Sequence, residues 1–288
     1  MIGGDRLKNG AGIAEEFINK MGSAEHIKGE PGDYIGADGR LHCGKCHEGK
    51  EFYFKPFDRY VPSLCRCGRI ERDDFERRQR ENQDLTMVQE LSTYNLMDEK
   101  LLKATFENAE MREESADAYT MAKNYVKRFD EICASKDDMK GLLIYGPTGT
   151  GKSYLAACIA NALMKNRVPV LFTSVIRMTS ADPDTVREVI GQTRRARLLV
   201  LDDLGAERGT DFKLEQVFNI IETRSNSRKP LIVTTNYSEN DMRGENDVRY
   251  KRIWERVRAM CYPVRMESVS WRKDITAEAL ERFRKLTT

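Results

Sequence analysis

The sequence predicts an α/β fold in the C-terminal half of the chain, where helices flank a parallel sheet. A helical connector and a small cysteine-containing module precede it. The first supporting observation is that short apolar runs alternate with helical patterns, which is typical of a parallel sheet covered on both faces. The second is a glycine-rich turn between the first apolar run and the following helix. The third is a cluster of four cysteines near the N-terminus.

The bulk composition is that of a globular protein. A chain of 288 residues with 40% hydrophobic residues can bury at least one full-sized core. Its 48 basic and 46 acidic side chains nearly cancel to a net charge of +2, so any nucleic-acid contact must use a local patch. No stretch reaches the roughly 18 apolar residues of a membrane span, and the N-terminus lacks a signal-like run. We therefore expect a cytoplasmic protein without a membrane partner.

Composition changes along the chain predict four regions. Residues 1–40 are rich in glycine and are expected to be loosely ordered. Residues 41–75 hold the cysteine cluster, and residues 76–112 form a helical connector because the charged stretch 71–100 contains neither Gly nor Pro. Residues 113–288 form the α/β domain.

The elements of the α/β domain follow from its periodicity. A first helix is predicted by one apolar face, formed by Ala118, Met121, Ala122, Tyr125, Val126, Phe129 and Ile132. Strands are predicted at residues 142–145, 168–172, 198–201 and 231–234. Helices are predicted between these strands, and one of them begins at Asp182, an N-cap residue followed by Pro183.

The glycine-rich turn fits the P-loop pattern. It reads Gly146-Pro147-Thr148-Gly149-Thr150-Gly151-Lys152-Ser153 and stands between a predicted strand and a predicted helix. Glycines let successive backbone N–H groups face phosphate oxygens, and the helix start adds its positive dipole end. Lys152 is expected to reach the β- and γ-phosphates, and the Ser153 hydroxyl is expected to ligate magnesium. We therefore predict a site for ATP and Mg²⁺.

Polar residues at two later strand ends are candidates for the same site. Asp202 follows an apolar strand and is predicted to bind the magnesium ion through water. Asp203 is the candidate that orients or deprotonates an attacking water, and Glu207 is a further candidate for this role. Asn236 ends the run LIVTTN, where it can contact the γ-phosphate or the water; an ordinary strand end predicts a polar residue there as well.

Three segments, GLLIYGPTGTGKSYLAACIANALMKNRVPVLF, LLVLDDLGAE and LIVTTN, closely resemble the AAA+ ATPases of the DnaC/DnaI-type replicative helicase loaders. The resemblance extends from Phe106 onward. It implies that Lys152 and Ser153 belong to the Walker A element, Asp202 and Asp203 to Walker B, and Asn236 to sensor 1.

Two further assignments rest on the resemblance. The segment KRIWERVRAM looks like box VII, which implies that Arg256 is an arginine finger for a neighbouring subunit, with Arg252 as the fallback. Read from its residues alone, the segment is a basic helix with a solvated charged face. The segment SVSWR is similar to sensor 2 and nominates Arg272 to contact phosphate. Asp203 stands where most AAA+ enzymes carry a glutamate, so we expect slow hydrolysis that is stimulated by a partner or by DNA.

The cysteine cluster predicts a zinc site. Cys43 and Cys46 have a standard zinc-knuckle spacing, whereas Cys65 and Cys67 have only one residue between them. We predict a zinc ion held by these four cysteines, because so small a module lacks the core to fold unaided. Reduced structural thiols are the alternative, and a neighbouring histidine, His42 or His47, can replace a thiolate.

The surface of the module has two interpretations. Basic residues interleave with aromatics, which suits single-stranded nucleic acid, but a solvated rim around a metal explains the pattern as well. The basic residues are Lys45, Lys50, Lys55, Arg59, Arg66 and Arg69. The resemblance implies that this module docks on the helicase.

Together with these features, the resemblance implies an ATP-dependent loader that binds a hexameric replicative DNA helicase through its N-terminal region and delivers it to single-stranded DNA during replication initiation. Several copies are expected to assemble on the helicase ring. Two alternatives stay open: an IstB-type transposition ATPase, and a zinc-dependent DNA-binding adaptor with vestigial hydrolysis.

Overall fold

The structure of the chain is a computed structural model, and its contacts divide the chain into two compact units, Met1–Glu81 and Asn82–Thr288. The residues that it describes are 25–95, 97–176, 182–205, 211–268 and 270–287. Residues 1–24, the larger part of the segment expected to be loosely ordered, therefore lie outside the described part. Within that part, none of the helices is both long enough and apolar enough to span a membrane.

The N-terminal unit is built from two small antiparallel hairpins and the start of a long helix. Strand β1 (Tyr34–Ile35) pairs with β2 (Leu41–His42), and β3 (Glu51–Phe54) pairs with β4 (Arg59–Pro62). Strand β1 lies in the segment that the sequence left as loosely ordered. A short 3₁₀ turn, Lys55–Phe57, joins β3 to β4.

Helix α2 (Arg66–Ser92) is the predicted helical connector, and it begins directly after Cys65. The boundary proposed at residue 75 lies inside this helix. Its surface is stabilised by ion pairs at helical spacing, such as Arg80 with Glu76 at 3.2 Å. Near its C-terminal end Leu91 is fully buried in the core of the C-terminal unit. A short helix, α3 (Glu99–Leu102), follows.

The C-terminal unit contains a five-stranded sheet in the order β6-β7-β8-β5-β9, and all neighbouring strands run parallel. Its strands are β5 (Gly141–Tyr145), β6 (Val170–Ser174), β7 (Leu198–Asp202), β8 (Leu231–Thr235) and β9 (Cys261–Arg265). The four predicted strands are confirmed, with ends that differ by a few residues. Strand β9 was not predicted: it lies at the sheet edge and contains Pro263, which an edge strand tolerates.

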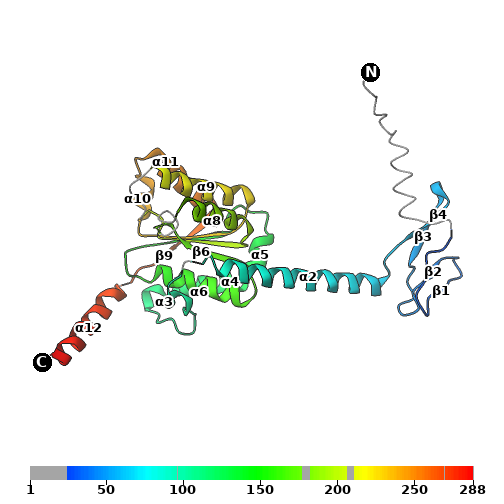
Figure 1. Cartoon of the computed structure of the whole chain (residues 1–288), viewed down its shortest axis with the longest axis horizontal. Coiled ribbons are helices and arrows are strands. Elements are labelled where there is room, and N and C mark those ends of the chain that lie inside the picture. Colours follow the sequence, from blue (N-terminus) through cyan, green and yellow to red (C-terminus); the bar gives the residue numbers. More distant parts are fainter. Residues whose placement is uncertain (1–24, 96, 177–181, 206–210, 269, 288) are drawn as a thin grey trace, which may run out of the picture. The chain divides into compact units, whose positions relative to one another are not determined.

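Helices cover both faces of this sheet, as Figure 1 shows. They are α4 (Ala116–Lys127), α5 (Phe129–Ala134), α6 (Lys152–Lys165), α8 (Pro183–Arg195), α9 (Asp211–Ser227), α10 (Glu239–Arg243) and α11 (Val248–Met260). Helix α12 (Trp271–Thr287) does not take part in this cover, and most of its described side chains are exposed. Helices α4 and α6 supply one hydrophobic core, and α9 and α11 supply the other. The predicted α/β class, with a parallel sheet between helices, is confirmed.

Local signals in the sequence explain several helix boundaries. The Asp182 carboxylate accepts hydrogen bonds from the backbone N–H groups of Asp184 and Thr185, so the predicted N-cap of α8 is confirmed. The helix predicted over residues 118–132 is interrupted at Arg128, which separates α4 from α5. Both helices nevertheless pack their apolar residues on the same core.

A buried arginine on α9 fixes the chain where it enters two strands. Arg224 is fully buried, and its guanidinium donates to four backbone carbonyls at 2.7–2.9 Å, those of Thr193, Ala196, Arg197 and Pro230. Burial lowers the pKa of Arg224 to about 10. Because these carbonyls precede β7 and β8, Arg224 helps to set where both strands begin.

We predict that Arg224→Met lowers the free energy of unfolding by about 3–5 kcal/mol, because it removes the buried guanidinium that donates to four backbone carbonyls. Urea denaturation of the whole chain measures this change. Arg224→Lys is the matched control and should lose less, since its ammonium still donates to some of the carbonyls. Equal stability of the methionine variant and the wild type would contradict the role of Arg224.

Candidate nucleotide and metal sites

The phosphate loop joins the carboxyl end of β5 to the N-terminus of α6. Its backbone is left-handed at Gly146 and Gly149, with φ of 145° and 87°. A Cβ atom at Gly146 would lie 2.2 Å from the Met266 carbonyl oxygen, and one at Gly149 would lie 2.1 Å from Ser270 Oγ. Both positions therefore require glycine. Since α6 begins at Lys152, the N–H groups of its first turn are available to an anion in the loop.

Lys152 is brought together with Asn236 across two adjacent strands. Its Nζ donates to Asn236 Oδ1 at 2.7 Å and to the Pro147 carbonyl oxygen at 2.8 Å, and the residue is only 5% exposed. Strands β5 and β8 are parallel neighbours, so their carboxyl ends meet at the same edge of the sheet. A phosphate in the loop would offer Lys152 a charged and therefore stronger acceptor than these neutral oxygens.

Ser153 and Asp202, the two predicted magnesium ligands, are also adjacent. The Asp202 carboxylate is 6% exposed and accepts hydrogen bonds from the Ser153 hydroxyl and from Thr234 Oγ1, the latter at 2.6 Å. Burial raises the pKa of Asp202, while these two hydrogen bonds oppose the rise. A hydroxyl and a carboxylate beside the phosphate loop are oxygen donors of the kind that Mg²⁺ prefers.

Thr234 is a further residue of the candidate site, and the sequence analysis missed it. Besides donating to Asp202, its Oγ1 accepts the backbone N–H of Asp203 at 2.9 Å. Asp203 itself has a left-handed backbone, with φ of 57°, so Thr234 holds a conformation that aspartate adopts at some cost. The signal was a hydroxyl residue at the end of an otherwise apolar strand. Glu207 lies outside the described residues.

The segment that follows β9 contacts the phosphate loop. The Trp271 backbone N–H donates to the Gly149 carbonyl at 3.0 Å, and Ser268 Oγ reaches the Thr150 carbonyl at 3.4 Å. The Arg112 guanidinium stacks 3.9 Å from the centre of the Trp271 ring. Arg272 follows at the start of α12, so its backbone stands beside the loop, but its side chain is outside the described part of the structure.

Arg256 lies apart from the site of its own chain. Its Nη2 atom is 3.2 Å from Glu222 Oε1, and its guanidinium lies over the Phe218 ring at 4.7 Å. None of the contacts found among the described residues joins Arg256 to its own phosphate loop. The structure thus brings Lys152, Asn236 and the magnesium ligands together but leaves the predicted finger on another surface.

The cysteine cluster has the geometry of a thiolate metal site. The Sγ atoms of Cys43, Cys46 and Cys65 all lie within 4.8 Å of one another. Tetrahedral zinc with Zn–S bonds of about 2.3 Å requires sulfurs about 3.8 Å apart, so these three fit with small shifts. Cys67 contacts the same group: its thiol hydrogen-bonds to Cys46, which raises the pKa of Cys67 to about 11. Backbone N–H donors of Cys67 and Glu48 lower the pKa of Cys46 to about 6.

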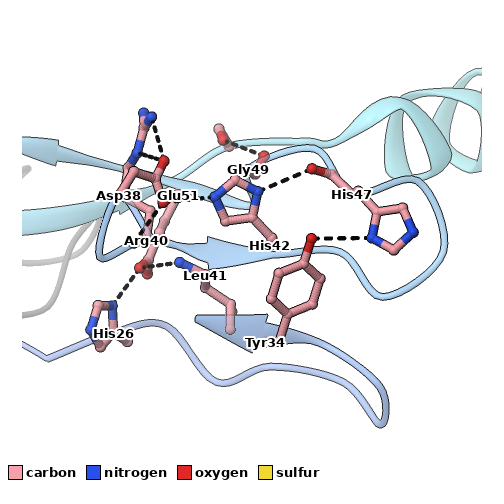
Figure 2. Close-up of polar contacts among 10 residues, drawn as sticks. His26, Tyr34, Asp38, Arg40, Leu41, His42, His47, Gly49 and Glu51 are labelled. Atoms are coloured by element: carbon pink, nitrogen blue, oxygen red, sulfur yellow. Dashed lines mark hydrogen bonds and ion pairs between the residues drawn. The ribbon is translucent and has the colours of Figure 1, made fainter. Parts of the chain in front are cut away.

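Two buried carboxylates hold the frame of this module. Asp33 accepts the Gly44 backbone N–H at 3.0 Å and so fixes the turn between Cys43 and Cys46. Glu51, 1% exposed, accepts the backbone N–H of Leu41 at 2.8 Å and also bonds His26, as Figure 2 shows. Polar contacts thus replace much of the apolar core that the module lacks.

The described histidines bond to other groups. His42 bonds the Asp38 carboxylate through Nε2 and the His47 carbonyl through Nδ1, while His47 Nδ1 bonds the Tyr34 hydroxyl (Figure 2). The metal-binding group found among the described residues contains cysteines only. This arrangement favours a thiolate site over one in which a histidine replaces a cysteine.

We predict that the purified chain retains one zinc ion per molecule through dialysis, measured by elemental analysis. Cys43→Ser and Cys65→Ser should lose the zinc, because each removes a buried thiolate ligand. Cys133→Ser is the matched control, since Cys133 is a free thiol far from the cluster in the sequence, and it should retain the metal. A metal-free protein whose N-terminal module is ordered by NMR would rule out the site.

We predict that Asp202→Asn weakens Mg²⁺-dependent ATP binding on the order of 10- to 100-fold, as expected for a group that holds a metal through water. The same variant should raise the thermal midpoint of the nucleotide-free protein at pH 8. Burial raises the pKa of Asp202 in the folded state, so ionisation above the unfolded pKa destabilises the fold, and asparagine removes this cost. Calorimetry measures both quantities, and a lower midpoint for the variant would contradict the argument.

Comparisons with known proteins agree with this geometry. The family model described as IstB-like ATP binding protein matches residues 70–279. The replicative helicase loader DnaI of Bacillus subtilis (strain 168) is 26% identical over 183 residues, which are 58% of this chain and 58% of DnaI. The replicative helicase loader DnaC of Escherichia coli (strain K12) is 30% identical over 146 residues, 48% of this chain and 57% of DnaC.

A crystal structure of DnaI superposes with a TM-score of 0.50 at 28% identity, covering 60% of this chain and 96% of that one. The chain spans less than two thirds of the length of the curated relatives it matches. The predicted resemblance to the DnaC/DnaI-type proteins is confirmed for the ATP-binding part. Because the matched region covers well over half of the sequence, the chain belongs to the IstB-like ATP-binding protein family.

Proposed function

We propose that this protein is an ATP-dependent loader that binds a hexameric replicative DNA helicase and delivers it to single-stranded DNA. The observation that carries the proposal is the convergence of Lys152, Asn236, Ser153 and Asp202 at one edge of the sheet, in a chain similar to proteins named replicative helicase loaders. Several copies assemble on the helicase ring, and the nucleotide state controls capture and release.

In this proposal ATP is hydrolysed slowly. Lys152 holds the β- and γ-phosphates, Ser153 ligates Mg²⁺ and Asp202 holds the ion through water. Asp203 orients the attacking water, and its fixed backbone and short side chain support modest activity in an isolated copy. Arg256 of one copy completes the site of its neighbour by neutralising charge on the transferred phosphoryl group. Asn236 and Arg272 also contact the phosphates.

The N-terminal module docks on the helicase. Phe52, Phe54 and Phe57 are 37–44% exposed, and the Phe54 ring lies beside both of the others on the β3–β4 hairpin. An exposed aromatic patch of this kind is typical of a protein interface. Several cations that could bind nucleic acid have acidic partners in the module: Lys50 pairs with Asp33. This charge balance favours a protein partner over DNA for the module.

Ion pairs of two further basic residues also argue against a single-stranded nucleic-acid surface on the module. Arg66 and Arg69 both contact the Glu48 carboxylate, at 3.5 and 2.8 Å. Phosphate binding would have to break these ion pairs, which costs part of the electrostatic gain. In this proposal single-stranded DNA is therefore engaged by the helicase and the ATPase part, with the zinc module acting on the helicase.

The second candidate function is a transposition ATPase, because the family model that matches the chain carries the IstB name. Such a protein would use the same nucleotide site to act on a transposase and target DNA. The cysteine cluster lies before residue 70, where the family match begins, and its presence favours the loader.

We predict that the chain co-purifies with a replicative helicase in ATP, binds it less in ADP, and transfers it to a single-stranded oligonucleotide. Lys152→Ala should abolish delivery, because losing hydrogen bonds to charged phosphates costs about 1.5–3 kcal/mol, roughly 10- to 150-fold in ATP affinity. Lys165→Ala, an exposed lysine at the other end of α6, is the matched control and should deliver normally.

The outcomes separate the candidates. Retained partner binding and function in Lys152→Ala would indicate an adaptor with vestigial hydrolysis. Absence of helicase binding, together with ATPase activity stimulated by DNA, would instead support the transposition ATPase.

A further inference from the structure

Helix α11 presents two different faces. The residues that pack into the core are Ile253, Trp254, Val257 and Met260, all of them buried. Arg252 and Arg256 are four residues apart, so they share a different face of the helix. Arg252 is exposed and Arg256 is 33% exposed. The two arginines thus share a helix face but differ in their surroundings.

Helix α9 packs against α11 and supplies the surroundings of Arg256. Phe218 and Glu222 are also four residues apart, so they stand one turn from each other on the same side of α9. The Phe218 ring lies 4.7 Å from the Arg256 guanidinium carbon, and Glu222 Oε1 lies 3.2 Å from Arg256 Nη2. Among the contacts found for the described residues, no ring or carboxylate makes the same pair of interactions with Arg252.

This arrangement restrains the Arg256 side chain but leaves most of its guanidinium N–H donors available. A long side chain loses up to about 2 kcal/mol of rotamer entropy when it is fixed. The ring and the carboxylate already restrict the rotamers of Arg256 within its own chain, so less of this entropy is lost when a partner binds. One ion pair engages a minority of the guanidinium N–H donors, so the others can still contact a phosphate. The fold therefore holds Arg256 in a limited set of positions.

The contact contributes little to stability, because both partners are partly exposed to solvent. The Glu222 side chain is 40% exposed, and an ion pair of this kind contributes less than about 1 kcal/mol. Replacing Glu222 should thus leave the fold intact. An effect of such a replacement on assembly would then report on how the guanidinium is presented.

We infer that Phe218 and Glu222 are positioning residues that hold the Arg256 guanidinium ready for the γ-phosphate in a neighbouring copy. The inference rests on the proposed function, in which copies of this chain assemble with ATP between them. It also selects Arg256 over Arg252, since the fold restrains only the former by a ring and a carboxylate among the described contacts.

The test is self-association of the full chain, measured by sedimentation velocity in a non-hydrolysable ATP analogue and in ADP. Glu222→Gln and Phe218→Leu should weaken the association seen with the analogue by about three- to tenfold, because each loosens the guanidinium. The dissociation constant of the analogue for the isolated chain should not change in either variant, and the thermal midpoint should not change in Glu222→Gln; Phe218→Leu should lower the midpoint slightly, because Phe218 also packs against the core. Glu215→Gln, an exposed glutamate earlier on α9, is the matched control.

A double-mutant cycle separates positioning from other effects. Arg256→Ala should weaken the analogue-dependent association more than either single variant and should leave association in ADP unchanged. In that background Glu222→Gln should have no further effect. A further loss there would show that Glu222 acts by another route and would overturn the positioning role.

The remaining outcomes distinguish the inference from the proposed function. If Arg256→Ala weakens association and the Phe218 and Glu222 variants do not, only the positioning role fails. If Arg256→Ala has no effect, or if the wild type does not associate in the analogue, the finger itself fails and the proposed assembly fails with it. Helicase binding by the N-terminal module would be untouched by either result.

Discussion

One hydroxyl group, that of Thr234, connects the two strands on which the nucleotide site depends. It donates to the Asp202 carboxylate on β7 and accepts the N–H of Asp203 beyond it, so this side chain adds two hydrogen bonds between the ends of β7 and β8. A register slip of one residue would turn Asp202 to the opposite face of the sheet. The same register fixes where β8 ends. It therefore places Asn236, the residue after β8, where its side chain contacts Lys152. The fold positions the site because these parallel strands end together.

The site keeps two charges away from water. Asp202 and Lys152 are both buried, and burial raises the pKa of Asp202 despite the hydrogen bonds that stabilise its ionised form. Such a carboxylate costs stability in the nucleotide-free protein, but a metal ion offsets that cost when it binds. Lys152 is restrained by two neutral oxygens that a phosphate can displace. Both charged side chains therefore have partners in the nucleotide-free protein that a phosphate and a metal ion could replace.

Local patterns in the sequence predicted the parts of the fold that depend on neighbouring residues. The glycine-rich loop, four apolar strands and the Asp182 cap were of this kind. Strand β9 was missed because it is a partly exposed edge strand that contains a proline, so it resembles neither a buried strand nor a turn. Thr234 and the Arg256–Glu222 contact depend on residues more than thirty positions apart, which no local pattern contains. Whether a histidine replaces a cysteine at the metal site could not be predicted either, because only the folded module shows that the His42 and His47 rings bond to other groups.

The division of charged groups between the site and the surface suggests an order of events on the proposed function. A single copy brings together the lysine, the amide and the oxygen ligands that are proposed to bind ATP and magnesium, so on this proposal binding does not need a neighbour. The arginine that would neutralise charge during hydrolysis is held on α11 against α9, away from that copy's own loop. Catalysis of phosphoryl transfer depends above all on electrostatic stabilisation of the transition state. Hydrolysis would therefore wait for assembly, and the nucleotide would report whether a neighbouring copy is in place.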